Sequence, residues 1–281
     1  MPELPEVETI VRALREGGRS GPSILGKRVQ SAELLWQRTL AEPGSGLFLT
    51  RLPGQVVTGV ARRAKFIIIR MDADALLVHL RMSGDLRVEN DGALQPHDRM
   101  VLHFADGWRL AFNDARKFGR VWLVPDENQV LAGLGPEPFD PALTADNFYR
   151  RLQERRRQIK PLLLDQSFLA GMGNIYTDEA LHLAKIHPLQ NSADLTFEQA
   201  DRLLAALRLV LQEGIRTNGA SIDWVYRGGE FQNTFRAYAK TGSPCPECGT
   251  PIARIVVGQR GTHYCPSCQV LRSKIQSSER V

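Results

Sequence analysis

The sequence predicts an α+β chain of several small domains, and three observations support this fold class. First, 281 residues correspond to one large domain or to two or three small ones. Second, short β-branched or aromatic runs fill residues 24–124, whereas apolar residues follow helical spacing from residue 147 onward. Third, all four cysteines lie within residues 238–281, a segment too short for a conventional hydrophobic core.

The composition excludes several classes of protein. Apolar residues make up 43% of the chain and charged residues 24%, values that argue against wholesale disorder and fibrous repeats. No apolar run approaches the roughly 18 residues that a membrane-spanning helix needs. The N-terminus is acidic and lacks the basic start and apolar core of a signal peptide. We therefore expect a cytoplasmic protein with no membrane partner.

The first 124 residues are expected to form one helix followed by a series of strands. Apolar residues recur with helical spacing from Val7 to Leu14, Pro5 suits the first turn, and Gly17-Gly18 end the helix. Turn residues such as Asp106-Gly107 separate the later apolar runs, a spacing typical of a sandwich or a barrel. The predicted strands are 56–60, 65–71, 75–80, 99–104, 108–112 and 120–124.

A linker and a helical region follow the strands. Residues 133–141 contain two glycines and three prolines, which indicates a linker. Residues 219–234 contain glycine and asparagine and are predicted to form a loop. The predicted helices, read from apolar spacing, are 147–152, 160–164, 174–185 and 197–213.

The cysteines have the spacing of a metal site. Cys245-Pro-Glu-Cys248 and Cys265-Pro-Ser-Cys268 are separated by 16 residues, within the range of a four-thiolate zinc site. Two disulfides or four free thiols are the alternatives, and a cytoplasmic setting argues against stable disulfides. Because four thiolates leave no open coordination position, we expect one structural Zn²⁺ that allows this module to fold.

Positive charge is concentrated in two segments. The net charge is +5, yet residues 149–160 carry five arginines and one lysine against one glutamate. Residues 238–281 carry four arginines and two lysines against two glutamates. Concentrated positive charge attracts polyanions, of which nucleic acid is the first candidate. The alternative on charge alone is that both segments form ordinary solvated faces.

The N-terminus carries a candidate nucleophile. The small residue Pro2 favours removal of Met1, and Pro2 then has a free secondary amine. An α-amino group has a reference pKa of about 7.7–8, against about 10.4 for lysine, so a useful fraction of such amines is neutral at pH 7. Attack of this amine on the anomeric carbon of a sugar gives an iminium ion, an electron sink that makes neighbouring protons acidic. Glu3 is placed to act as acid or base. The alternative is that these residues simply begin a helix.

Together, these residues carry a family resemblance that runs in order along nearly the whole chain. The sequence resembles the formamidopyrimidine-DNA glycosylases, the Fpg/MutM branch of the Fpg/Nei family. The matching segments, beside the four cysteines, are Pro2–Thr9, Arg63–Lys65, His79–Gly84, Asp114–Gly119, Leu134–Pro138, Ile159–Pro161, Gly171–Tyr176 and Gln259–Thr262.

The resemblance implies the domain order. An N-terminal helix and β-sandwich catalytic domain are expected over residues 1–135, and a linker over 136–145. A helix–two-turn–helix DNA-binding domain with a lesion-capping loop is expected over 146–237, and a β-hairpin zinc finger over 238–281. A single catalytic N-terminus needs no symmetric partner, so a monomer is expected.

The resemblance also assigns catalytic roles. It implies that Pro2 is the Schiff-base nucleophile and that Glu3 is the acid that opens the sugar and helps to release the base. Lys65 matches the family's proton donor for β-elimination and contact to phosphate. Arg260 matches the zinc-finger arginine that grips phosphate and assists δ-elimination. Without the resemblance, Lys65 reads as an ordinary lysine beside an apolar strand.

Further residues match positions that contact DNA. Chemistry on a duplex base requires the base to leave the stack, and side chains must fill the gap. The void-filling positions match Met82, Arg116 and Phe118, which as isolated residues read as core or surface. A helix N-terminus near Asn174 suits a phosphate, although Asn174 also suits a helix cap. The full set of expected DNA contacts is His79, His97, Arg116, Arg155 (or its neighbours 156 and 157), Lys160 and Asn174.

The sequence departs from the family pattern at two places. Arg81 stands where the family often has glycine, and Ala115-Arg116-Lys117 stands where it often has Pro-Arg-Arg. Neither departure removes a catalytic group. The resemblance implies a bifunctional DNA glycosylase and abasic-site lyase acting on double-stranded DNA with oxidised purines or abasic sites, in a bacterial, nucleoid-associated setting.

Three other functions explain part of the same pattern. An endonuclease VIII-type enzyme uses the same N-terminal chemistry on oxidised pyrimidines. A non-catalytic zinc-containing protein that binds damaged DNA needs the basic segments and cysteines but not Pro2, Glu3 and Lys65 together. A zinc ribbon for protein contacts leaves the paired basic segments unexplained.

Overall fold

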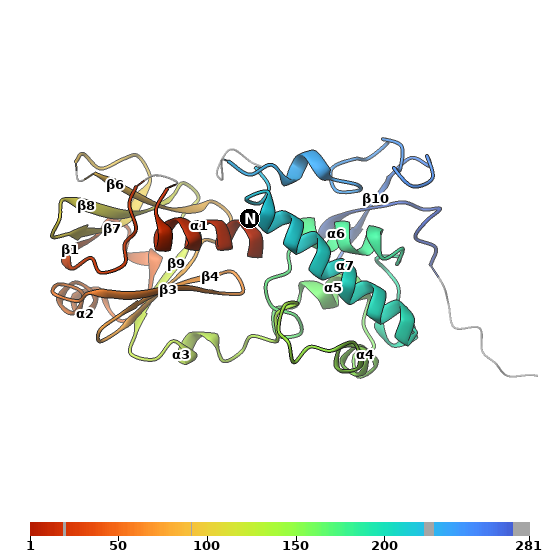
Figure 1. Ribbon diagram of the computed structural model, residues 1–281, viewed down its shortest axis with the longest axis horizontal. Coiled ribbons are helices and arrows are strands. Elements are labelled where there is room, and N and C mark those ends of the chain that lie inside the picture. The colour runs from red at the N-terminus through yellow and green to blue at the C-terminus, as the bar shows by residue number, and fades with distance from the viewer. Residues whose placement is uncertain (19–20, 91, 222–227, 272–281) are drawn as a thin grey trace, which may run out of the picture. The chain divides into compact units, whose positions relative to one another are not determined.

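The computed structural model describes residues 1–18, 21–90, 92–221 and 228–271, and these form two compact units (Figure 1). The first unit contains residues 1–133 and 214–232, and the second contains residues 134–213 and 233–281. Residues 214–221 and 228–232 therefore pack with the N-terminal part of the chain. Of the predicted loop 219–234, residues 222–227 lie outside the described residues.

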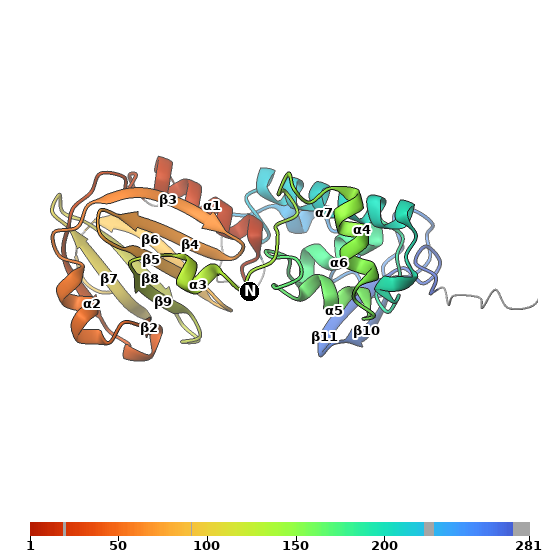
Figure 2. The same ribbon diagram turned by 90° about the horizontal axis from the view of Figure 1, so that it is seen from below.

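The first unit is a β-sandwich with a helix packed against it (Figure 2). One antiparallel sheet has four strands in the order β1 (Val29–Leu34), β7 (Asp98–Phe104), β8 (Trp108–Asp114) and β6 (Gly84–Asn90). The other has five in the order β2 (Leu40–Glu42), β9 (Arg120–Val124), β5 (Ala75–His79), β4 (Phe66–Met71) and β3 (Val57–Arg63). Side chains from both sheets share one apolar core, so the structure selects the sandwich over the barrel.

Helix α1 (Leu4–Glu16) agrees with the predicted first helix. Its apolar residues, including Val7, Ile10 and Leu14, are almost completely buried, and the helix packs against β3 and β4. The backbone N–H of Gly17 closes the last turn on the carbonyl of Ala13, and Gly17 has a φ of 82°. The predicted strands do not include β1, β2 or β6, and the short helix α2 (Ser45–Arg51) was not predicted either. A third helix, α3 (Asn128–Leu131), precedes the linker.

The second unit is helical, with a β-hairpin near its end. The predicted helices correspond to α4 (Ala145–Gln153), α5 (Ile159–Leu164), α6 (Asn174–Leu183) and α7 (Phe197–Arg216). The hairpin consists of β10 (Ala253–Val257) and β11 (Arg260–Tyr264), and β11 packs on α6. None of the helices in the described part of the chain has the length and apolar character needed to cross a membrane.

Candidate active site and nucleic-acid interface

A buried carboxylate, that of Glu6, holds the N-terminus of the first unit. Pro2 and Glu3 are buried at the head of α1, and the Glu3 backbone N–H donates a hydrogen bond of 2.7 Å to Oε2 of Glu6. The other oxygen of Glu6 accepts a hydrogen bond of 2.8 Å from the backbone N–H of Ala220. A Cβ on Gly219 would lie 2.6 Å from Glu6 Oε1, so the backbone passes close to the carboxylate. Glu6 thus joins the N-terminal segment that carries the candidate nucleophile to the first residues of the predicted loop 219–234.

Lys65 and His79 lie on neighbouring strands of the five-stranded sheet. Lys65 occupies the tight turn between β3 and β4, after Ala64 with a φ of 53°, and its side chain is buried. His79 ends β5, and its ring makes an edge contact with Phe66 at 4.8 Å between centroids. Burial, together with the positive charges of Arg81 and Lys65, lowers the pKa of His79 to about 3.

His79 is therefore neutral at physiological pH. Its Nδ1 accepts a hydrogen bond of 3.1 Å from the backbone N–H of Arg81, which assigns the proton to Nε2. The predicted contact of His79 with DNA can only be that of a neutral hydrogen-bond donor. A cation at this position is supplied by Lys65 or Arg81 instead.

The buried neutral histidine predicts a specific acid sensitivity. The unfolded chain takes up a proton on His79 below pH 6.5, whereas the folded chain resists it down to about pH 3. Stability is therefore lost as pH falls through this window, by up to about 1.4 kcal/mol per pH unit from this residue. His79→Gln should show a correspondingly shallower loss between pH 6 and pH 4, measured by urea unfolding. Equal slopes in the two proteins would contradict the assignment.

The predicted void-filling residues lie on two turns at one edge of the sandwich. Met82 is half-buried in the turn between β5 and β6. Arg116 and Phe118 are exposed in the turn between β8 and β9, with the guanidinium carbon of Arg116 at 5.1 Å from the centroid of the Phe118 ring. His97, exposed just before β7, has a φ of 75°. An exposed aromatic ring and a stacked guanidinium suit insertion between bases.

In the second unit, Lys160, a predicted contact to DNA phosphate, is buried. Its side chain is 0% exposed, and the ammonium lies 2.5 Å from Oδ1 of Asp178. The same nitrogen donates to Thr262 Oγ1 at 2.8 Å and to the carbonyl of Gly261 at 3.2 Å. In this structure Lys160 links α5, α6 and the hairpin, and its predicted contact with phosphate stays a prediction.

Asn174 and Arg260 lie next to this link. Asn174 begins α6, with Gly173 rather than Asn174 as the N-cap, and its Nδ2 donates to the carbonyl of Gly261 at 3.0 Å. Arg260 is exposed at the start of β11, and its carbonyl accepts a hydrogen bond of 3.0 Å from Thr262 Oγ1. Arg155 is exposed within the basic run that follows α4. Asn174 thus joins the start of α6 to the hairpin that carries Arg260.

The four cysteines fit a structural zinc ion. Their Sγ atoms all lie within 4.8 Å of one another, with Cys245 and Cys268 at 4.0 Å and Cys248 and Cys265 at 3.5 Å. Zinc–sulfur bonds of about 2.3 Å in a tetrahedron require sulfur separations of about 3.8 Å, so this arrangement accepts the ion. Nε2 of His182 lies 3.3 Å from Cys245 Sγ, where an N–H stabilises thiolate charge.

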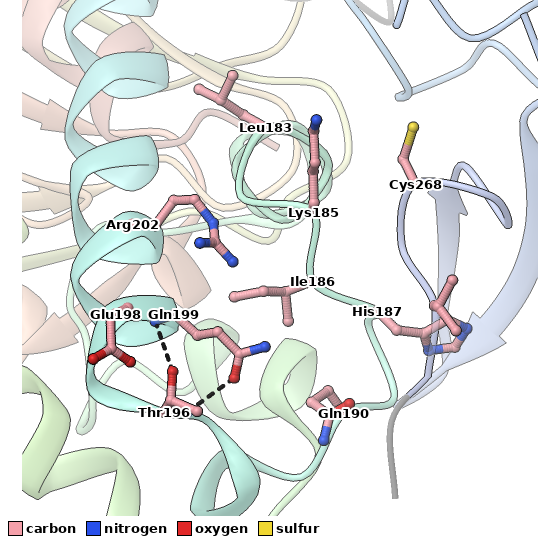
Figure 3. A pocket seen from close by; sticks show the side chains of 11 residues that line it. Leu183, Lys185, Ile186, His187, Gln190, Thr196, Glu198, Gln199, Arg202 and Cys268 are labelled. Carbon is pink, nitrogen blue, oxygen red and sulfur yellow. Dashed lines mark hydrogen bonds between the residues drawn. The ribbon is translucent and has the colours of Figure 1, made fainter. Parts of the chain in front are cut away.

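A pocket of about 570 Å³ opens beside the second cysteine pair (Figure 3). Lys185, Arg202 and Cys268 are among the side chains that line it. Nε of Arg202 donates to the carbonyl of Ala184 at 2.9 Å, and the amide of Gln269 donates to the carbonyl of Ile186 at 2.8 Å. The first bond joins α7 to the end of α6, and the second joins the zinc module to the α6–α7 connection. The lining contains no predicted catalytic residue.

Three buried carboxylates that organise these sites were not predicted as site residues. Glu6 follows Glu3 at the spacing of a capping box, so its bond to the Glu3 backbone was open to prediction. Asp114 begins the segment that carries Arg116 and Phe118. Its carboxylate binds Gly119 of that segment and Ser83 of a separate turn, a contact that no local pattern predicts. No local sequence pattern predicts the contacts of Asp178, because its partners lie 18 or more residues away along the chain.

Family comparisons cover almost the whole chain. A formamidopyrimidine-DNA glycosylase N-terminal domain model matches residues 1–121, and the corresponding H2TH domain model matches residues 134–225. A model of the zinc finger found in FPG and IleRS matches residues 242–270. This match and the clustered thiols confirm the predicted structural zinc.

Relatives and solved structures agree with the family models. A formamidopyrimidine-DNA glycosylase of Chloroflexus aurantiacus is 44% identical over 96% of this chain and 98% of its own. That of Ligilactobacillus salivarius is 40% identical over 97% of this chain and 100% of its own. A structure of MutM bound to DNA containing carbocyclic 8-oxo-G is 37% identical, with a TM-score of 0.87 over 96% of this chain and 100% of MutM.

A Lactococcus lactis FPG mutant bound to Fapy-dG DNA is 36% identical and has a TM-score of 0.88, covering 96% of this chain and 100% of that one. The fold class, with its β-sandwich, helix–two-turn–helix region and zinc-finger hairpin, is thereby confirmed. These matches run from end to end and include each of the three domain types. The chain therefore belongs to the formamidopyrimidine-DNA glycosylase family.

Proposed function

We propose that this chain excises oxidised purines, 8-oxoguanine and formamidopyrimidines, from double-stranded DNA and then cleaves the strand at the abasic site. The observation that carries the proposal is the buried N-terminus, where Pro2 and Glu3 are fixed by Glu6. Relatives of the family supply the substrate class, because they have been solved with 8-oxo-G, Fapy-dG and abasic DNA. The enzyme acts as a single chain at the nucleoid, where its substrate lies.

The chemistry begins once Met1 has been removed. The neutral amine of Pro2 attacks C1′ of the damaged nucleotide, and the bond to the base breaks with its electron pair leaving on the base. Glu3 donates the proton that opens the sugar and helps the base to leave. The product is an iminium ion between Pro2 and C1′. Loss of a proton from C2′ then expels the 3′ phosphate, and a second elimination through the conjugated system expels the 5′ phosphate.

Further residues hold and protonate the DNA during these steps. Lys65, buried near the β3–β4 turn, is the proposed proton donor of β-elimination, and the exposed Arg260 is the proposed phosphate contact that assists δ-elimination. Met82, Arg116 and Phe118 fill the space that the extruded base leaves. The zinc ion, when bound, holds the hairpin that presents Arg260 and takes no part in bond breaking.

Borohydride trapping on a duplex with 8-oxoguanine opposite cytosine tests the proposal. Reduction converts the iminium ion into a permanent protein–DNA bond that is visible on a denaturing gel. The parent protein should give this crosslink, and Pro2→Gly should abolish or strongly reduce it. Pro5→Gly is the matched control, because it changes a buried proline of the same helix start without changing the terminal amine. Its crosslink should match that of the parent.

The outcomes separate the alternative functions. A crosslink to an abasic duplex or to thymine glycol, with none to 8-oxoguanine, would move the substrate to the oxidised pyrimidines of an endonuclease VIII-type enzyme. No crosslink to any of these, with DNA binding intact, would support a non-catalytic protein that binds damaged DNA. DNA binding that weakens with rising salt would exclude a module for protein contacts, because neutralisation of phosphates by the protein releases counterions.

A further inference from the structure

Asp114 is a fully buried carboxylate at the end of β8, directly before the turn that carries Arg116 and Phe118. Its Oδ2 accepts a hydrogen bond of 2.7 Å from the backbone N–H of Gly119, which closes that turn. Its Oδ1 accepts a hydrogen bond of 3.2 Å from the backbone N–H of Arg116. One side chain therefore fixes both ends of the Arg116–Phe118 turn.

The same carboxylate reaches the Met82 turn. Oδ1 of Asp114 accepts a short hydrogen bond from the hydroxyl of Ser83, the neighbour of Met82. The Ser83 oxygen in turn accepts a hydrogen bond of 3.1 Å from the backbone N–H of Arg116. The two turns that carry the void-filling residues thus meet at a triangle of Asp114, Ser83 and the Arg116 amide.

The backbone of Asp114 adds a third segment. Its N–H donates to the carbonyl of His97 at 3.0 Å, and its carbonyl accepts from Nε of Arg99 at 2.8 Å. A guanidinium nitrogen of Arg99 also lies 3.3 Å from Nδ1 of His97. His97, a predicted DNA contact, is thereby fixed to the same residue.

All three segments contain residues whose backbone conformation is locally unfavourable. Arg81, His97 and Lys117 have φ values of 54°, 75° and 61°, in the left-handed region that side chains other than glycine rarely adopt. Gly84 and Gly119 pass so close to their neighbours that a Cβ would lie 2.6 Å from the Leu80 carbonyl oxygen and 2.4 Å from the Phe112 ring, respectively. Conformations of this kind persist only where surrounding contacts over-determine them.

We propose that Asp114 is a positioning residue for base extrusion, which sets Met82, Arg116 and Phe118 in the relative arrangement that fills the duplex when the damaged base leaves. The inference rests on the proposed function of the chain as a glycosylase. Asp114 makes no contact with the reacting atoms in this proposal, so base extrusion and elimination should respond differently to its loss. Extrusion of a stacked base depends on Asp114, and elimination at a sugar that has already lost its base does not.

Asp114→Asn is the variant that tests the inference. An amide keeps the size of the side chain but replaces one acceptor oxygen with a donor, while three donors converge on the carboxylate. One backbone N–H or the Ser83 hydroxyl then loses its acceptor, whichever way the amide turns. Lys117 holds the outside of the Arg116 turn independently, with its ammonium 4.1 Å from the centroid of the Trp36 ring. The turn should therefore loosen without unfolding the sandwich.

The measurement compares two single-turnover rates. Excision of 8-oxoguanine opposite cytosine should fall about 10- to 100-fold in Asp114→Asn, as expected for misplaced side chains. Cleavage of a preformed abasic site in single-stranded DNA should stay within about threefold, because no base needs to leave a stack. Ser83→Ala should also lower the rate of excision relative to the rate of abasic-site cleavage. Asp74→Asn is the control, because Asp74 is a buried carboxylate of the same unit, bound to Arg51 and Gln55.

A structural signal accompanies the rates. Fluorescence of 2-aminopurine placed beside the lesion rises when a wedge separates the bases, and this rise should be slower in Asp114→Asn but unchanged in Asp74→Asn. An equal loss of both rates, or no loss of either, would overturn the positioning role. A parent protein that cleaves abasic DNA but leaves 8-oxoguanine intact would instead refute the proposed substrate. In that case, the rate of excision relative to the rate of abasic-site cleavage is measured on thymine glycol. If neither base is excised, the rise of 2-aminopurine fluorescence tests the positioning role instead.

Discussion

Removal of zinc is expected to unfold residues 242–270 and to leave the sandwich of the first unit folded. The described apolar core of this module consists of Ala237, Cys245, Ile252 and Cys265, with Cys268 packed against it, and two of its four buried members are themselves thiol ligands. Structural zinc sites contribute about 10–16 kcal/mol of apparent binding free energy, far more than so small a core supplies. Without the ion, four thiols at these separations have no bond to hold them together.

Hydrogen exchange after treatment with a chelator measures this effect. Amides of β10 and β11 should lose protection, whereas those of β4 and β5, in the five-stranded sheet, should keep theirs. Cys265→Ser should give the same pattern without a chelator, and added zinc should restore the parent but not the variant. DNA affinity should fall with the hairpin, because Arg260 lies on β11. Retained protection in the hairpin would show that its packing on α6 suffices.

Helices and strands were predictable where the local sequence pattern favours the same structure that the tertiary packing imposes. Helix α1 was predictable because its buried face repeats with helical spacing and glycine ends it. Strand β6 was missed although Leu86 and Val88 alternate with charged residues, because it contains a single β-branched residue and Gly84 begins it as a turn would. Helix α2 was missed because a single buried residue, Phe48, fixes its seven residues to the core.

The site was less open to prediction from local pattern. The cysteine spacing alone indicated zinc, and the thiols do cluster. The chemistry of Pro2 and Glu3 indicated a nucleophile and an acid or base, but the same residues also read as a helix start. The role of Lys65 came only from the family resemblance, because by itself it reads as an ordinary lysine beside an apolar strand. The direction of the Lys160 side chain could not be predicted, since it depends on Asp178 and on a hairpin about one hundred residues later.

Lys160→Met is expected to destabilise the second unit by about 3–5 kcal/mol. The substitution leaves the carboxylate of Asp178, whose side chain is 0% exposed, without its ammonium partner, and the backbone N–H and ring of His263 become its remaining contacts. Urea unfolding measures the change. Lys240→Met, at an exposed lysine of the same unit, should alter the free energy of unfolding by no more than about 0.5 kcal/mol.

A double variant separates the ion pair from the packing around it. Lys160→Met combined with Asp178→Leu removes both charges, so it should recover part of the loss and leave a deficit of about 1–3 kcal/mol for the unpaired N–H of His263. Full additivity of the two single changes would mean that the two charges do not interact.

The salt dependence of DNA binding then decides between an internal link and a phosphate contact. If Lys160 reaches a phosphate, its removal lowers the slope of log affinity against log salt by about one. If Lys160 is an internal link, the hairpin of the folded variant still presents Arg260 to its phosphate, so the slope stays that of the parent. Arg260→Met should therefore lower the slope on its own, and Lys160→Met, measured where the protein is folded, should leave it unchanged. A lower slope in folded Lys160→Met would return Lys160 to the DNA interface and would require its ammonium to exchange Asp178 for a phosphate on binding.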